Sequence, residues 1–159
     1  MKNILNAGML SLIGFLLFTI ACKTAPVEAP ALDLAQIRTE IQAMEDAYAL
    51  GQNAKDVAAI MPYYAGDAVS LPDEHPPVSG ADAIMAYLKE DLLADTLGYS
   101  SSFEVIDLFT DGRYVVETGK STVKDSTGAV ISTGKYMSLF EKRDGKYVCI
   151  RDIFNTDAK

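Results

Sequence analysis

The sequence predicts an α+β domain in which three helices come first and an antiparallel sheet follows. In the first half of the chain, apolar residues recur at spacings of three and four, which is typical of amphipathic helices. Four β-rich runs fill the second half, and two of the three separators between them contain Asp-Gly, a strong hairpin signal. This segregation favours helices packed on one face of a curved sheet.

The first predicted helix has one apolar face, made by Leu34, Ile37, Ile41, Met44 and Tyr48. We expect this helix to end at Gly51, since glycine is common just after helix ends. Asn53 is then predicted to cap a short second helix, with Asp56 as its capping-box partner. Pro62 marks the end of that second helix.

A small hairpin is predicted between the second and third helices. Residues 68–71 are strand-like, and the proline-rich stretch 72–77 reads as a turn. The third helix is predicted to begin at Ser79, a good N-cap residue with Asp82 in the capping-box position.

The four β-rich runs cover residues 99–109, 113–124, 129–143 and 146–155. Successive side chains of a strand point to opposite faces. On the last strand, one predicted face holds Tyr147, Cys149, Arg151, Ile153 and Asn155. The other holds Val148, Ile150, Asp152 and Phe154. Both sets mix polar and apolar residues, so we expect neither face to be simply solvated.

Residues 1–21 have the layout of a secretory signal peptide, with Lys2 in front, an apolar run, and a small residue before Cys22. The tetrad 19–22, Thr-Ile-Ala-Cys, resembles the lipobox of bacterial lipoproteins. The resemblance implies that Cys22 becomes the first mature residue and carries lipid. An uncleaved transmembrane helix and plain secretion with another cleavage site are the alternatives.

The predicted division of the chain therefore has three parts. Residues 1–21 are the signal peptide, residues 22–31 are the lipidated cysteine with a Pro/Ala tether, and residues 32–159 form one domain. We expect the protein to be secreted across the inner membrane. Acyl chains would hold it in the bacterial cell envelope, on the periplasmic or outer-membrane face.

The chain has 14 basic and 22 acidic residues, a net charge of −8. Removing the signal peptide with Lys2 leaves 13 against 22, or −9. Such a surface repels phosphate backbones, so we expect no nucleic-acid partner. There are two cysteines. If Cys22 carries lipid, Cys149 has no partner for a disulfide and is expected to be a small buried hydrophobe.

Two groups of residues carry a family resemblance. The first group is Ala47-Tyr48, Gly51, Asp56, Tyr64, Gly66-Asp67-Ala68-Val69, Pro76-Pro77-Val78, Gly80 and Ala83-Ile84. The second is Gly134-Lys-Tyr136, Phe140-Glu-Lys, Asp144-Gly145-Lys146-Tyr147, Asp152-Ile-Phe154-Asn155 and Asp157. Together they resemble the DUF4440 family, a SnoaL-like group of the NTF2-like superfamily, which also holds ketosteroid isomerase. One departure is that the family usually has Trp where Tyr147 stands.

The resemblance implies a cone-shaped fold in which a strongly bent antiparallel sheet wraps around the helices and leaves a cavity at its open end. In this superfamily the cavity binds small, often apolar molecules. Many members form dimers through the outer face of the sheet, and most DUF4440 members have no assigned reaction. A shared fold does not carry a shared activity.

Isomerase chemistry of the ketosteroid isomerase kind needs a carboxylate base and neutral hydrogen-bond donors in an apolar pocket. Glu117, in the middle of an apolar strand, and Asp152 are the candidate bases, and Asp107 is a weaker one. The alternative for Glu117 is an outward charge in a cross-strand pair with Lys135 or Arg151, and we expect this alternative.

Tyr48, Tyr64 and Tyr87 are candidate ligand contacts, because each could donate a phenol hydrogen bond into a cavity. The alternative is that they are core aromatics. Arg151 and Asn155 are candidate polar groups at a pocket mouth. For Arg151 the alternative is an ion pair with an acid of a neighbouring strand, and we expect this alternative.

His75 is the only histidine, and it is predicted to be an exposed residue at the hairpin tip. It becomes a ligand contact if this loop overhangs the cavity. Without a second histidine or a free cysteine, a transition-metal site is not expected. No motif for a nucleotide or another cofactor is found, so no cofactor is predicted.

Three functions remain open. The first, which we favour, is a membrane-anchored module that binds a small, apolar ligand or a partner protein in the envelope without catalysing a reaction. The second is an isomerase or a polyketide-cyclase-like enzyme with a pocket carboxylate. The third is a structural homodimer that associates through the sheet. A carboxylate inside a tyrosine-lined cavity would favour the second function.

Overall fold

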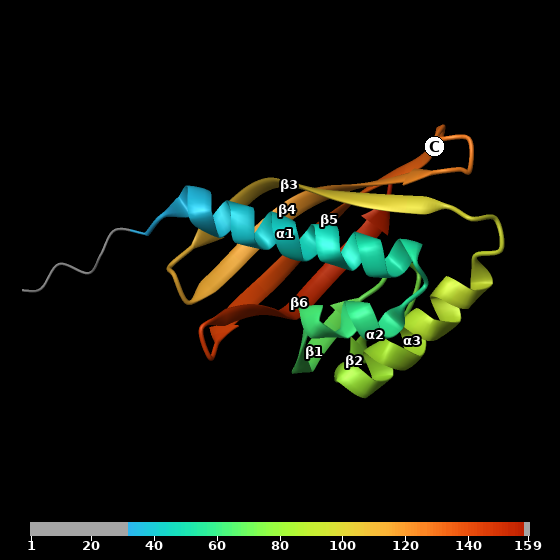
Figure 1. Cartoon of the computed structure of the whole chain (residues 1–159). Coiled ribbons are helices and arrows are strands. Elements are labelled where there is room, and N and C mark those ends of the chain that lie inside the picture. Colours follow the sequence, from blue (N-terminus) through green and yellow to red (C-terminus); the bar gives the residue numbers. More distant parts are fainter. Residues whose placement is uncertain (1–31, 158–159) are drawn as a thin grey trace, which may run out of the picture. The chain divides into compact units, whose positions relative to one another are not determined.

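The computed structural model describes residues 32–157, and the predicted signal peptide, Cys22 and the whole predicted tether lie outside these residues. The predicted α+β order is confirmed (Figure 1). In chain order the elements are α1 (Leu34–Asn53), α2 (Val57–Ile60), the 3-10 helix η1 (Met61–Tyr63), β1 (Tyr64–Leu71), β2 (Val78–Ser79), α3 (Ala81–Ala94), β3 (Ser100–Thr110), β4 (Tyr114–Lys124), β5 (Val130–Arg143) and β6 (Lys146–Thr156).

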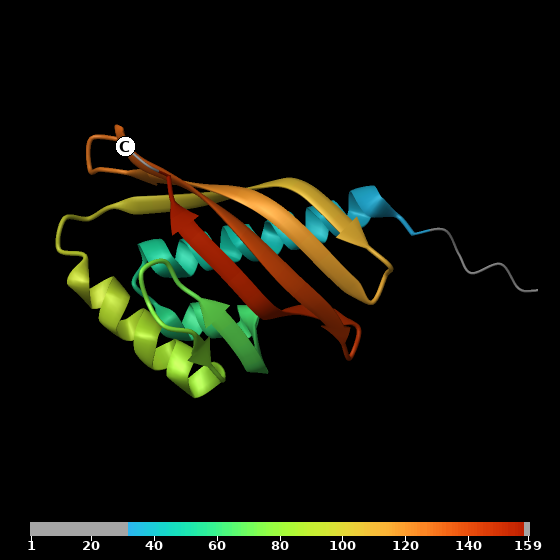
Figure 2. The same ribbon diagram turned by 180° about the vertical axis from the view of Figure 1, so that it is seen from behind.

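The six strands form one curved sheet in the order β2-β1-β6-β5-β4-β3. The predicted antiparallel meander of β3 to β6 is confirmed. The predicted hairpin of β1 and β2 also forms, and β1 extends the sheet by running parallel to β6. Helix α1 crosses one face of the sheet (Figure 1), whereas no helix of residues 32–157 covers β4, β5 and β6 on the face seen from behind (Figure 2).

The helix ends differ from the prediction. Helix α1 continues through Gly51 to Asn53, because Gly51 is buried against α2 and a Cβ there would lie 2.7 Å from Cγ1 of Ile60. Asp56 is the cap of α2, and Asn53 instead exchanges two hydrogen bonds with the β3 backbone. The cap of α3 is Gly80, one residue later than predicted, with a φ of +87° that suits glycine.

Polar side chains of α1 hold the helix against β3, which is an edge strand. The Arg38 guanidinium donates to the carbonyls of Val105 and Ile106 at 2.7 and 2.8 Å. The Gln42 amide donates to the Phe103 carbonyl and accepts from the Val105 amide, both at 2.9 Å. These bonds satisfy backbone groups that an edge strand would otherwise expose. They also hold the first half of α1 against β3.

A β-bulge in the β5–β6 pair changes which residues face the concave side. Cys149 pairs with Phe140, but the next pair is Arg151 with Leu139. The extra residue moves Asp152 to the same face as Cys149, and both side chains are buried. The strict two-residue alternation predicted for the last strand is therefore wrong beyond Cys149.

The core lies between the helices and the concave face, and its fully buried residues include Ile41, Ile60, Ile84, Val115, Phe140 and Cys149. On the opposite face of the sheet, the side chains of Phe109, Met137 and Ile153 are 47–67% exposed. A dimer formed through this face stays a prediction. None of the helices in residues 32–157 is long and apolar enough to cross a membrane.

Candidate functional site

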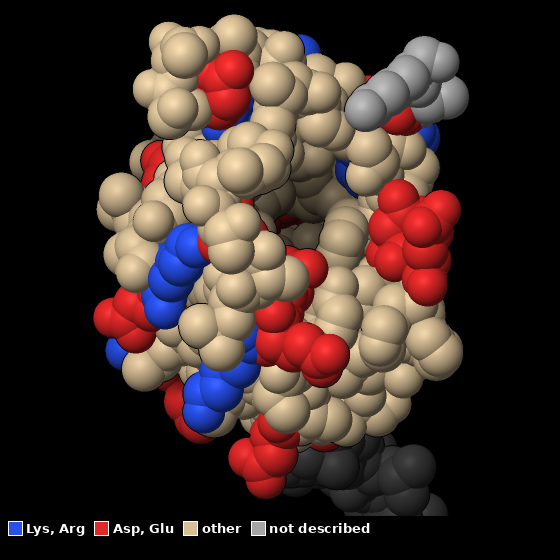
Figure 3. Space-filling model, turned by 90° about the vertical axis from the view of Figure 1, so that its right-hand side faces the viewer, with Lys and Arg blue, Asp and Glu red and all other residues tan. Residues whose placement is uncertain are grey.

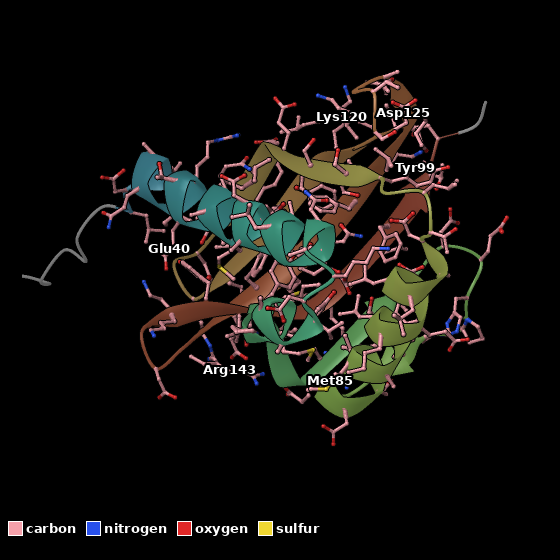
Figure 4. The ribbon with its side chains drawn as sticks, turned by 45° about the vertical axis from the view of Figure 1, so that its right-hand side comes forward. Glu40, Met85, Tyr99, Lys120, Asp125 and Arg143 are labelled. Carbon is pink, nitrogen blue, oxygen red and sulfur yellow. The ribbon has the colours of Figure 1, made fainter. Side chains whose placement is uncertain are left out.

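A cavity of about 190 Å³ lies between α1 and the concave face of the sheet. Figure 3 shows a hollow from the side on which α3 runs into β3, with acidic residues in red beside it. Tyr99, Lys120 and Asp125 mark the same end of the domain in Figure 4. Residues that line the cavity include Glu45, Tyr48, Gln52, Tyr63, Ser101, Phe103, Ser121, Ser132, Tyr136, Ser138, Asp152, Phe154 and Asn155.

Glu45 is the buried carboxyl that α1 contributes to this cavity. Its side chain is 3% exposed, and the Tyr63 hydroxyl donates to its Oε1 at 2.6 Å. The same hydroxyl lies 3.1 Å from Oγ of Ser138 on β5. The short 3-10 helix therefore links the carboxyl on α1 to the floor of the sheet.

Asp152 is the buried carboxyl that β6 contributes. The Tyr64 hydroxyl donates to its Oδ2 at 3.1 Å, and the Tyr48 hydroxyl lies 3.4 Å from that of Tyr64. The other carboxyl oxygen, Oδ1, is buried and has no hydrogen-bond partner among residues 32–157. One oxygen of Asp152 is thus bonded to protein, while the second is buried without a hydrogen-bond partner among the described residues.

Glu117 lies on β4 opposite Ser138 and has no exposed surface. Neither of its carboxyl oxygens has a hydrogen-bond partner within the described part of the chain. The expected pairing of Glu117 with Lys135 or Arg151 is wrong, because β4 turns this side chain toward the core. Glu117 is not among the residues that line the cavity.

Tyr136 lines the cavity because Gly119 leaves room for its ring. A Cβ on Gly119 would lie 2.0 Å from Cζ of Tyr136, so the phenol crosses β4 where glycine has no side chain. The Tyr136 hydroxyl is buried and forms no hydrogen bond within residues 32–157, although it is near enough to Glu117 to lower the pKa of that carboxyl.

Burial raises the pKa of all three carboxyls above ordinary values. The pKa of Glu45 reaches about 8, through burial and then through the nearby charge of Glu117. Burial raises the pKa of Glu117 to about 7, against the lowering effects of Tyr136 and Arg38.

Asp152 keeps the lowest pKa of the three, about 6. Burial raises it, while Ser70 and the hydrogen bond from Tyr64 lower it. Near pH 7 the site therefore holds a protonated acid on Glu45 and an ionised carboxylate on Asp152.

The other predicted site residues do not all meet at the cavity. Asn155 lines the cavity at its rim. Arg151 is exposed, donates to the Asp67 carbonyl at 3.3 Å and forms no ion pair within residues 32–157. His75 is exposed at the β1–β2 turn and packs on Tyr87 with ring centroids 5.0 Å apart. Neither ring is among those that line the cavity.

Two further acids, Asp107 and Glu45, differ from the expectations of the sequence analysis. Asp107 is exposed and accepts from the neighbouring Leu108 amide at 2.8 Å, so it is not part of the site. Glu45 was missed by the sequence reasoning, although a signal was present. It follows Ile41 by four residues and precedes Tyr48 by three, so it lies within the apolar stripe of α1.

A second hollow of about 380 Å³ lies on the other side of Tyr48 and Tyr63, which line both spaces. Met44, Pro62 and Tyr147 also line it. It contains none of the three buried carboxyls, and the cavity is therefore the stronger candidate site. No group of three metal-ligating side chains occurs within the part of the chain that the structure describes.

The chain belongs to the SnoaL-like family, since a SnoaL-like domain matches residues 42–150. No curated protein matches the sequence. Solved structures match its fold. A cystatin-like protein of unknown function from Nostoc punctiforme superposes with a TM-score of 0.70 at 13% identity, covering 79% of this chain and 94% of its own.

Two further structures support the same fold. A ketosteroid isomerase-like protein from Erwinia carotovora atroseptica has a TM-score of 0.60 at 22% identity, and covers 77% of this chain and 97% of its own. An NTF2-like protein of unknown function from Shewanella oneidensis has a TM-score of 0.62 at 18% identity, with 73% and 96% covered. At these identities the likeness extends to the fold alone.

Proposed function

We propose that the domain binds a small molecule in the cavity between α1 and the sheet. The observation that carries this proposal is Asp152, a buried carboxyl with one oxygen bonded to Tyr64 and the other without a hydrogen-bond partner within residues 32–157. It stands in the wall of a cavity that is also lined by the rings of Phe103 and Tyr136. A few placed polar groups among apolar walls are typical of ligand sites.

Blocking the cavity mouth tests this proposal. A thermal-shift screen of the purified protein against small metabolites should find ligands that raise the melting temperature. Ser132→Trp, which puts a large ring at the cavity rim, should abolish these shifts. Ile131→Trp, one residue away and exposed, is the matched control and should leave them intact. Shifts that survive in Ser132→Trp would place the binding elsewhere.

Proton transfer is the second candidate function, of the isomerase or cyclase kind. The pKa of Glu45 is about 8 and that of Asp152 is about 6. This difference favours proton transfer, because such a pair supplies an acid and a base near neutral pH. Incubation with a simple ketone such as cyclohexanone in D₂O should then exchange the protons next to its carbonyl faster than buffer does. Asp152→Asn should remove this acceleration, and equal rates with and without protein would refute it.

We infer that lipid on Cys22 holds this domain in the cell envelope. The layout of residues 1–21 and the tetrad that ends at Cys22 support this inference. A short tether at 22–31 would keep the cavity close to the membrane surface. Membership of the DUF4440 group within the SnoaL-like family remains part of the same proposal.

A further inference from the structure

We propose that the cavity takes an organic cation, a protonated amine on an apolar body, with its ammonium group between the carboxyls of Glu45 and Asp152. The apolar body would lie against the aromatic residues of the walls. This proposal rests on the proposed function, because it names the class of ligand that the same cavity would hold.

The charges around the cavity are the first observation that favours a cationic ligand. Glu45 and Asp152 line it, and Glu117 is close enough to Glu45 to raise the pKa of that group. No Lys, Arg or His is among the described residues that line the cavity. Arg38 lowers the pKa of Glu117, and its guanidinium is already bonded to two β3 carbonyls. The field in the cavity therefore repels anions and attracts cations.

A buried carboxyl oxygen without a hydrogen-bond partner among the described residues is the second observation that favours a cationic ligand. Asp152 lines the cavity and is 9% exposed, and its Oδ1 has no hydrogen-bond partner within residues 32–157. Ionised carboxyls only accept hydrogen bonds, whereas an ammonium group only donates them. An amine in the cavity would supply the donors that Asp152 lacks, through charge-assisted hydrogen bonds.

The aromatic residues in the cavity walls are the third observation that favours an organic cation. Tyr48, Phe103 and Tyr136 line the cavity and pack edge to face in a row, with ring centroids 5.6 and 5.7 Å apart. Aromatic rings attract organic cations through their π electrons and also cover apolar surface. A hydrated metal ion would gain nothing from such walls, and no three metal-ligating groups converge within the described residues.

The titration of the carboxyls gives the proposal a signature. The negative charge of Asp152 raises the pKa values of Tyr48, Tyr64, Tyr87, Glu45 and Cys149, none of which is a cation. Burial raises the pKa of both lining carboxyls. A bound ammonium would lower those pKa values, so binding should release protons and strengthen as pH rises.

Three probes with one ring test the ligand class: benzylamine as cation, benzyl alcohol as neutral molecule and benzoate as anion. Binding to the purified full chain in mild detergent is measured by isothermal titration calorimetry. We expect benzylamine to bind at least tenfold more tightly than either analogue at pH 7. Its affinity should rise about tenfold from pH 5 to pH 7 as Asp152, with a pKa of about 6, ionises. Buffers of different ionisation enthalpy should report proton release.

Variants locate the effect. Asp152→Asn should weaken benzylamine binding about tenfold or more at pH 7, whereas Glu45→Gln should weaken it only above pH 8, where Glu45 itself is ionised. Glu104→Gln, which removes one acidic charge from an exposed position on β3, should leave it unchanged. If benzyl alcohol or benzoate binds as tightly as benzylamine, the cation proposal is overturned while the proposed ligand site stands. If no probe binds at millimolar concentration, the cation proposal fails, and the thermal-shift screen with Ser132→Trp decides whether the ligand site stands. If a variant does not fold, the pH dependence of benzylamine affinity in the wild-type protein still tests the proposal.

Discussion

Replacing Glu45 by glutamine should remove much of the pH dependence of this protein's stability. In the folded chain the pKa of Glu45 is about 8, whereas a free glutamate has 4.5. Between these values the folded state keeps a proton that the unfolded state has lost. The stability linked to this proton is therefore fully present below pH 4.5 and is lost as pH rises through 8.

The size of the effect follows from the same two pKa values. At 1.36 kcal/mol for each pKa unit, the difference corresponds to about 5 kcal/mol at most. Part of it depends on the charge of Glu117, so a change of about 3–5 kcal/mol is expected. This is a large share of a typical folding stability of about 5–15 kcal/mol. The raised pKa values of Glu117 and Asp152 act in the same direction.

Urea denaturation followed by far-ultraviolet circular dichroism, at pH values from 5 to 9, measures this effect. Near pH 5, Glu45→Gln should differ little from wild type, because glutamine imitates the protonated acid and can still accept from Tyr63. At pH 9 the variant should be the more stable protein by about 3–5 kcal/mol. Glu104→Gln, as control, should track wild type throughout. An offset between Glu45→Gln and wild type that does not change with pH would refute the reasoning.

Three further outcomes are expected. Gly119→Ala should lower the free energy of unfolding by about 1–3 kcal/mol, measured in urea, because its Cβ would lie 2.0 Å from the Tyr136 ring, and Tyr136→Ala should relieve this cost in the double variant. Cys22→Ala should abolish labelling by radioactive palmitate and shift the protein from membrane to soluble fractions; unchanged labelling would exclude Cys22 as the lipidated residue. If the outer face of the sheet forms a dimer, Met137→Glu should halve the mass measured by light scattering, whereas a monomeric wild type would rule the dimer out.

Much of the fold could be predicted because its signals are local. The Asp-Gly turns at residues 111–112 and 144–145 require particular backbone conformations, and Gly112 and Gly145 do adopt positive φ. The four predicted strands of the meander consequently match the structure within about a residue at each end. Helix ends were harder, since Gly51 stays inside α1 because of a tertiary contact with Ile60.

The site was only partly predictable. Asp152 and Glu117 were named as candidate bases, but a two-residue alternation could not show that a bulge after Cys149 turns Asp152 inward. Glu117 was expected to point outward because cross-strand ion pairs are common for charged residues on sheets. Glu45 had a visible signal, its place within the apolar stripe of α1, and reading that stripe for polar residues would have found it.

The sequence by itself determined the order of elements, the family, the acidic charge and the residue types available for chemistry. These properties depend on neighbouring residues or on composition. Tertiary structure alone decided which acids meet, because Glu45, Glu117 and Asp152 come from α1, β4 and β6. Their raised pKa values arise from burial between these elements, and burial is a property of the packed chain rather than of any segment.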